Sequence, residues 1–190
     1  SFTTMGEFYV ETGLNIIGMS AYKRILSLDS AMAVVQFKKD HVAYQRNYFI
    51  SYPANVMVMR FSADQPGKQN LVFSYAPNPV STGNMASDSN KGLVYSASLD
   101  NNGMKYVVRI QAETKGGTLS NADGKLTVKG ADEVVFYITA DTDYKPNFDP
   151  DFKEPKTYVG VNPEETTKEW MNNAVSQGYT AVSYTHLTLP

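Results

Sequence analysis

Short apolar runs, separated by turn-forming residues, dominate the pattern of the chain. Clusters of Gly, Pro, Asn and Asp recur at short intervals, and the segments between such clusters are typical of β-strands. Residues 56–61 and 134–139 are apolar at nearly every position, which predicts interior strands that are buried on both faces. Further strands are expected at residues 6–11, 23–28, 31–38, 42–50, 70–75, 93–99, 104–112 and 125–129.

The clearest turn lies between the strands expected at residues 93–99 and 104–112. Its residues, Asp100-Asn101-Asn102-Gly103, tolerate positive φ, and the apolar residues after it alternate with polar ones. This combination predicts a β-hairpin. Residues 77–91 and 141–156 lack any period and are expected to be loops.

One helix is expected near the end of the chain. Asn162 suits the N-cap, Pro163 suits the first helical position and Gly178 suits the C-cap, which together predict a helix from Pro163 to Gln177. About ten short strands followed by one helix indicate an all-β fold, an antiparallel β-sandwich. We expect residues 1–160 to form the sandwich and residues 161–181 to form the helical segment.

The last nine residues, 182–190, are expected not to belong to the natural protein. Their back-translation resembles the adapter of a transposon-based sequencing library, and such a scar is set aside in fold reasoning. We therefore expect Val182 and its successors to make few core contacts and the natural protein to be longer. His41 is then the one native histidine.

Composition argues against several classes of function. The formal net charge is −2 and no basic stripe is present, which argues against a nucleic-acid partner. The absence of cysteine excludes disulfides, thiolate catalysis and cysteine-based zinc sites. No apolar run approaches the roughly 20 residues that a membrane helix needs.

Candidate sites are weak. An acidic segment could bind a hard cation such as calcium, but Pro146 stands where an EF-hand loop needs glycine, and a solvated loop is the better interpretation. No pair of carboxylates is singled out for glycoside hydrolysis, and His41 lies at a turn without a ligand cluster. The acidic segment comprises Asp141, Asp143, Asn147, Asp149 and Asp151. Some aromatic residues could stack on sugar rings, but core packing is the better interpretation for them. These residues are Tyr44, Tyr48, Tyr52, Tyr75 and Trp170.

Five stretches of the sequence form an ordered set of motifs: residues 2–10 (FTTMGEFYV), 22–31 (YKRILSLDSA), 42–53 (VAYQRNYFISYP), 131–134 (ADEV) and 140–144 (ADTDY). In this order they resemble the N-terminal domain of family 95 glycoside hydrolases, the α-L-fucosidase family.

The resemblance implies a β-sandwich of the supersandwich type, with its first part absent, that packs in the full protein against a helical linker and an (α/α)6 catalytic barrel. It implies an inverting enzyme that acts on fucosylated glycans and is exported to the periplasm or cell surface. The catalytic positions of the family lie in the barrel, so we assign no catalytic, cofactor or metal residue here. Two alternatives stay open: a free-standing carbohydrate-binding module, and a structural or interaction domain.

Overall fold

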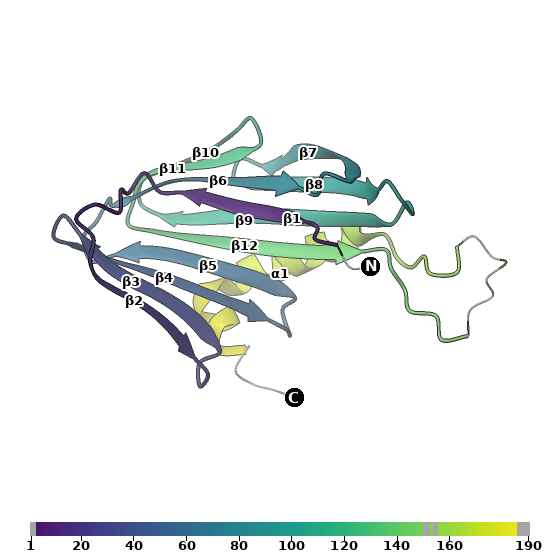
Figure 1. Ribbon diagram of the computed structural model, residues 1–190, viewed down its shortest axis with the longest axis horizontal. Helices are drawn as coiled ribbons and strands as arrows, with labels where there is room; N and C mark the ends of the chain where they lie inside the picture. Colours follow the sequence, from purple (N-terminus) through teal and green to yellow (C-terminus); the bar gives the residue numbers. More distant parts are fainter. Residues whose placement is uncertain (1–2, 150–152, 154–155, 186–190) are drawn as a thin grey trace.

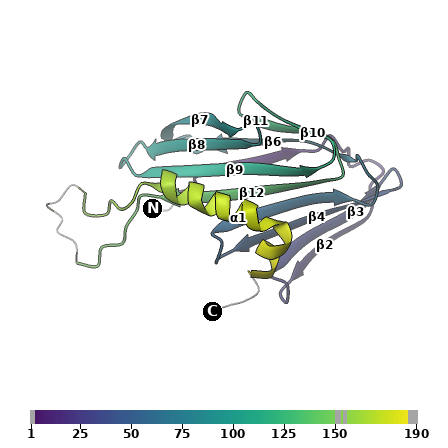
Figure 2. The ribbon, with the colours of Figure 1, turned by 180° about the vertical axis from the view of Figure 1, so that it is seen from behind.

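The computed structural model describes residues 3–149, 153 and 156–185. Within them, two β-sheets form a sandwich, and one helix packs on the outer face of the larger sheet (Figures 1 and 2). The elements are β1 (Gly6–Glu11), β2 (Ser20–Ser27), β3 (Met32–Lys39), β4 (Val42–Ser51), β5 (Val56–Ala63), β6 (Gln69–Pro77), β7 (Ser81–Ser89), β8 (Gly92–Leu99), β9 (Lys105–Lys115), β10 (Thr118–Ala122), β11 (Lys125–Ala131), β12 (Glu133–Thr142) and α1 (Pro163–Thr185).

The strand order confirms the predicted antiparallel sandwich. The larger sheet has the order β2-β3-β4-β5-β12-β9-β8-β7, and the smaller sheet has the order β1-β6-β11-β10. All ten pairings of neighbouring strands are antiparallel. β5 and β12 lie side by side in the middle of the larger sheet, which confirms the two predicted interior strands.

The main core lies between the sheets and is rich in aromatic side chains. Phe73 of β6 and Phe136 of β12 are fully buried, and their ring centroids are 4.6 Å apart. Phe61 of β5 meets Phe136 edge-on at 6.0 Å. Burial of each such ring contributes roughly 1.5–3 kcal/mol to folding, so this cluster holds the two layers together.

The helix begins where the sequence predicts. Asn162 Oδ1 accepts a hydrogen bond from the backbone N–H of Glu164 at 3.2 Å, and Pro163 is the first helical residue. Gly178 is non-helical, with φ 77° and ψ 167°, so the regular helix that begins at Pro163 ends there as predicted. The sequence does not predict the second helical piece, which follows this kink and continues to Thr185.

The kink brings Val182 into a second core, under the larger sheet. Val182 is fully buried in a cluster with Phe49, Val58, Tyr137 and Met171. The expectation that Val182 makes few core contacts is therefore wrong, because the turn at Gly178 redirects this apolar side chain onto the sheet. Residues 186–190 lie outside the described residues, and the origin of the 182–190 segment stays a prediction.

Residues 77–91, expected to be a loop, contain an edge strand. β7 pairs with β8 along most of its length. Its Ser, Thr, Gly and Asn residues are largely exposed on both faces, so no apolar alternation marks it. Gly83 permits close pairing, because a Cβ there would lie 2.4 Å from that of Ala97. Likewise, β12 extends to Thr142, into the segment expected to be a loop.

The turn between β9 and β10 depends on glycine. Here the chain passes from the larger sheet to the smaller one, and Gly116 and Gly117 have φ of 68° and 66°, in the left-handed region that favours glycine. A Cβ at Gly117 would lie 2.4 Å from the carbonyl oxygen of Lys129.

We expect Gly117→Ala to lower the free energy of unfolding by roughly 2–3 kcal/mol, since it combines left-handed strain with a backbone clash. Gly103→Ala is the matched control, because φ is 72° there but no atom lies within 4 Å of the added Cβ. It should cost only about 1 kcal/mol. Urea denaturation of both variants measures the difference, and equal losses would contradict this view of the turn.

Candidate functional site

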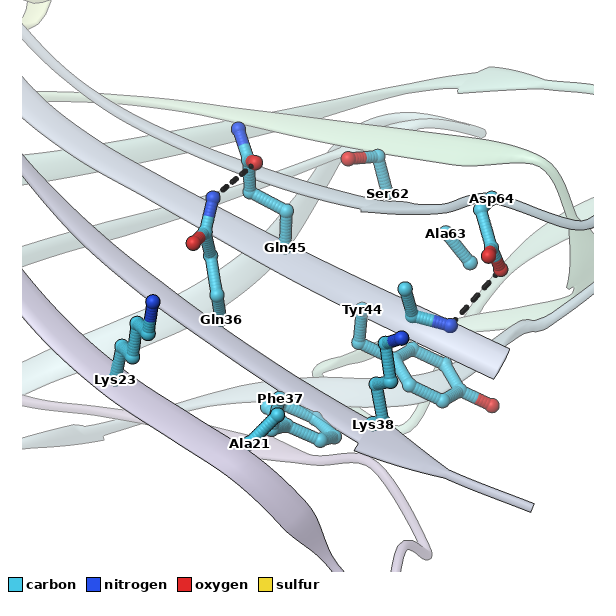
Figure 3. A pocket seen from close by; sticks show the side chains of 11 residues that line it. Ala21, Lys23, Gln36, Phe37, Lys38, Tyr44, Gln45, Ser62, Ala63 and Asp64 are labelled. Atoms are coloured by element: carbon cyan, nitrogen blue, oxygen red, sulfur yellow. Dashed lines mark hydrogen bonds between the residues drawn. The ribbon is translucent and has the colours of Figure 1, made fainter. Parts of the chain in front are cut away.

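A polar pocket with a volume of about 460 Å³ lies on the helix-side face of β2–β5 (Figure 3). Gln45 and Phe49 occupy the same face of β4, and the ring of Phe49 packs against Tyr179 of α1 at 5.8 Å, which places the pocket on the helix side. Its lining residues are Ala21, Lys23, Gln36, Phe37, Lys38, Ala43, Tyr44, Gln45, Ser62, Ala63 and Asp64.

A row of side-chain amides forms the centre of this face. Gln36 Nε2 donates to Gln45 Oε1 at 2.9 Å, and Gln45 Nε2 donates to Asn47 Oδ1 at 3.0 Å. Gln36 of β3 is directly paired with Gln45 of β4, and Asn47 lies two residues after Gln45 on the same face of β4. The amides orient one another, so the face offers fixed donors and acceptors to a polar ligand.

The pocket lacks the groups that hydrolysis of a glycoside needs. Asp64 is the one carboxylate among its lining residues, and Asp64 Oδ1 already accepts the backbone N–H of Ala43 at 2.8 Å. Hydrolysis by inversion uses two carboxyl groups, one as acid and one as base. Lys23 and Lys38 add positive charge but no second carboxylate. The pocket can hydrogen-bond a polar group; it cannot perform this reaction.

The acidic segment does not form a metal site within the described residues. In this part of the chain, no three His, Asp or Glu side chains lie close enough together to hold a metal ion. Asp143 is buried, and its Oδ1 accepts the backbone N–H of Lys105 at 2.9 Å. It therefore ties the end of β12 to the start of β9. Asp141 is half-buried, Asn147 and Asp149 lie further along the connection, and Asp151 lies outside the described residues.

The aromatic candidates divide between core and surface. Tyr44 and Tyr75 are buried, which agrees with the core interpretation, and burial raises the pKa of Tyr75. Tyr48 is half-buried. Tyr52 is 80% exposed and, with the half-buried Trp170, lines a second, more apolar pocket of about 390 Å³ at the β4–β5 turn. His41 is exposed at the β3–β4 turn with φ of 62°, as expected for a turn residue.

The sequence did not reveal the ion-pair site beneath the helix. Arg109 of β9 is only 4% exposed. Its NH1 lies 2.6 Å from Asp88 Oδ2 of β7, and its NH2 lies 3.2 Å from Glu164 Oε2 of α1. Glu164 also accepts a hydrogen bond from the hydroxyl of Ser96. The alternation in β9 places Arg109 on the polar face of the strand. The one signal in the sequence that the helix would cover this residue was the pair of acidic residues in the first turn of the helix.

Tyr137 lies on the same side of the sheet and contributes to the apolar cluster under the helix. Burial, assisted by the nearby Glu113 and Glu133 carboxylates, raises the pKa of Tyr137 to about 12. The phenol is therefore neutral at physiological pH. Its buried position in the cluster with Phe49, Val58 and Met171 is that of a packing residue.

Comparison with known proteins decides the family. Residues 1–147 match the family model described as "Glycosyl hydrolase family 65, N-terminal domain". The chain belongs to this family. The resemblance to a glycoside hydrolase N-terminal sandwich is thereby confirmed at this coarser level.

Two curated relatives of this family 65 N-terminal domain are named as fucosidases. "Probable alpha-fucosidase A" of Aspergillus niger is 27% identical over 197 residues, which cover 98% of this chain and 24% of that protein. "Alpha-L-fucosidase 2" of Arabidopsis thaliana is 26% identical over 168 residues, covering 72% of this chain and 18% of that protein. The chain thus spans a quarter or less of the length of these relatives.

A solved structure shares the fold of the domain. The one described as "Putative kojibiose phosphorylase from human microbiome" aligns with a TM-score of 0.60 over 95% of this chain and 26% of that chain. At 9% identity, this likeness concerns the fold alone. In the described part of the domain, no helix is long and apolar enough to cross a membrane.

Proposed function

We propose that this domain is the non-catalytic N-terminal sandwich of an inverting α-L-fucosidase of family 95 that acts on fucosylated glycans. The observation that carries the proposal is the alignment of nearly the whole chain with a protein named as a fucosidase, of which it covers about a quarter. The remaining three quarters of such a protein leave ample room for a separate catalytic barrel, the expected intramolecular partner. Export to the periplasm or cell surface belongs to the same proposal and rests on the sequence resemblance.

The geometry of the domain supports a non-catalytic role. The polar pocket on the helix-side face of the larger sheet presents a single carboxylate, that of Asp64, which is already hydrogen-bonded to the backbone. The buried acid Asp143 is engaged with the backbone of β9. Asp88 and Glu164 are paired with Arg109. These acids therefore have structural partners, whereas a general acid and a base must face the two sides of one sugar.

The natural full-length protein provides the test. We expect it to hydrolyse an aryl α-L-fucoside and 2′-fucosyllactose, and an aryl α-D-galactoside serves as the control for sugar specificity. Proton NMR during the reaction should show β-L-fucose as the first product, because inversion converts the α-linkage into the β-anomer. Absence of fucoside turnover would contradict the fucosidase assignment, and α-L-fucose as the first product would contradict inversion.

A further inference from the structure

The polar pocket on the helix-side face of the larger sheet contains a straight row of polar residues. Lys23 of β2 is paired with Gln36 of β3. Gln36 is paired with Gln45 of β4, and Gln45 is paired with Ser62 of β5. Directly paired residues lie on the same face of a sheet, about 4.8 Å apart. This polar row therefore crosses four neighbouring strands over about 14 Å, and Figure 3 shows its side chains on one side of the sheet.

Two lysines bring an excess of positive charge to this pocket. Lys23 is at one end of the polar row, and Lys38 lies two residues after Gln36 on the same face of β3. In the described part of the chain, neither lysine forms an ion pair. The one carboxylate of the lining, that of Asp64, accepts a backbone N–H. The chain as a whole carries a net charge of −2, so the positive charge is a local property of the pocket.

The backbone beside Lys23 is strained. The register of β2 shifts between Ser20 and Lys23, and Ala21, which lines the pocket, has φ of 51°. This left-handed conformation costs a residue such as alanine roughly 1–2 kcal/mol. Bulges and strained residues of this kind cluster beside functional sites, where they set the direction of a side chain. The strain therefore supports a binding role for Lys23.

The hydrogen-bonding groups of the polar row suit the hydroxyl groups of a sugar. A side-chain amide has two N–H donors, and Gln36 and Gln45 each use one in the bonds to Gln45 and Asn47. The second N–H of each amide and the hydroxyl of Ser62 can bond to a ligand. A sugar hydroxyl both donates and accepts, whereas a carboxylate only accepts and suits an ammonium group. The volume of about 460 Å³ is within the range of small-molecule sites.

We propose that this pocket binds a short acidic oligosaccharide, one whose sugar rings carry carboxylate groups. Its hydroxyl groups lie along Gln36, Gln45 and Ser62, and its carboxylates face Lys23 and Lys38. Both lysines are exposed, and exposed ion pairs are weak, so we expect a dissociation constant on the order of 1 mM. This binding function goes beyond the proposed function, because such a site holds the protein on an acidic glycan and takes no part in hydrolysis.

The test is a calorimetric titration of the natural full-length protein with trigalacturonate and, in parallel, with the neutral galactotriose of the same linkage. Trigalacturonate should bind at least about tenfold more tightly at low ionic strength, and about 0.5 M salt should remove most of this difference. The double variant Lys23→Gln with Lys38→Gln should weaken trigalacturonate binding at least about tenfold. Lys125→Gln with Lys129→Gln is the matched control, since it removes the same charge from exposed positions of β11 in the smaller sheet.

The outcomes distinguish an acidic sugar from other ligands. Tight binding of trigalacturonate that is lost in the pocket variant and kept in the control would support the proposal. Equal affinity for both trisaccharides, or no binding of trigalacturonate, would overturn it. Equal losses in the two double variants would overturn it as well, because they would mean that net charge alone attracts the ligand. Tetraglutamate is titrated as a further arm, and binding as tight as that of trigalacturonate would indicate an acidic peptide and contradict a sugar site.

Discussion

Replacing Phe136 by alanine is expected to lower the free energy of unfolding by about 3–5 kcal/mol. Phe136 is fully buried in the middle of the larger sheet, where it contacts Phe73 of the smaller sheet at 4.6 Å and Phe61 at 6.0 Å. Its removal leaves a cavity between the two layers, and the paired strands on either side restrict collapse around that cavity.

Equilibrium unfolding in guanidinium chloride, followed by tyrosine and tryptophan fluorescence, measures this loss. Phe148→Ala is the matched control, since Phe148 is 97% exposed and the chemical change is the same. The control should change stability by no more than about 0.5 kcal/mol. A loss below about 1 kcal/mol for Phe136→Ala would mean that this ring does not join the two sheets.

Neutralising both partners of Arg109 is the second change with a large expected effect. The double variant Asp88→Asn with Glu164→Gln should lose about 3–5 kcal/mol, because it leaves a buried guanidinium without a counter-charge. Arg109 is 4% exposed, and its partners come from β7 and α1. The change should therefore loosen both the edge strand and the start of the helix.

A single variant and a matched control show whether the loss of stability in the double variant comes from the missing counter-charge. Glu164→Gln alone should cost much less, since Asp88 stays 2.6 Å from the guanidinium. Glu165→Gln removes a neighbouring exposed acid of the same helical turn and should cost only about 0.3–1 kcal/mol through the helix dipole. If the double variant is no less stable than the Glu165→Gln control, the ion pairs do not hold the helix to the sheet.

The strands that the sequence predicts well are those whose environment is uniform along their length. β5 and β12 are apolar at nearly every position because one face packs on the smaller sheet and the other lies toward the helix. The β8–β9 hairpin follows from its turn residues, since Gly103 adopts φ of 72°. In these elements, local preference and tertiary packing favour the same structure.

The elements that the sequence misses depend on contacts between distant residues. β7 carries no apolar alternation, because both of its faces are largely exposed, and it forms a strand by pairing with β8. Val182 is buried because a kink at Gly178 returns it to the sheet. From the strand pattern alone, Arg109 is expected to face solvent. It is buried because the helix, more than 50 residues later in the chain, covers it.

The candidate site shows the same division. The sequence assigns no metal or catalytic role to its scattered acids, which stays a prediction, and in the structure Asp143 accepts a hydrogen bond from the backbone of Lys105. The hydrogen bond between the Gln36 and Gln45 amides could not be predicted, since these two residues become neighbours only through the register of β3 and β4. A polar residue on one strand does not indicate which strand will lie beside it.

The most direct test of the central claim is incubation of the purified 190-residue chain with an aryl α-L-fucoside and with 2′-fucosyllactose, beside the full-length protein at equal molar concentration. A non-catalytic N-terminal domain should give no turnover above the buffer blank, whereas we expect the full-length protein to release fucose. Turnover by the 190-residue chain that is lost when one of its own carboxylates, such as Asp64, is changed to the amide would contradict the account.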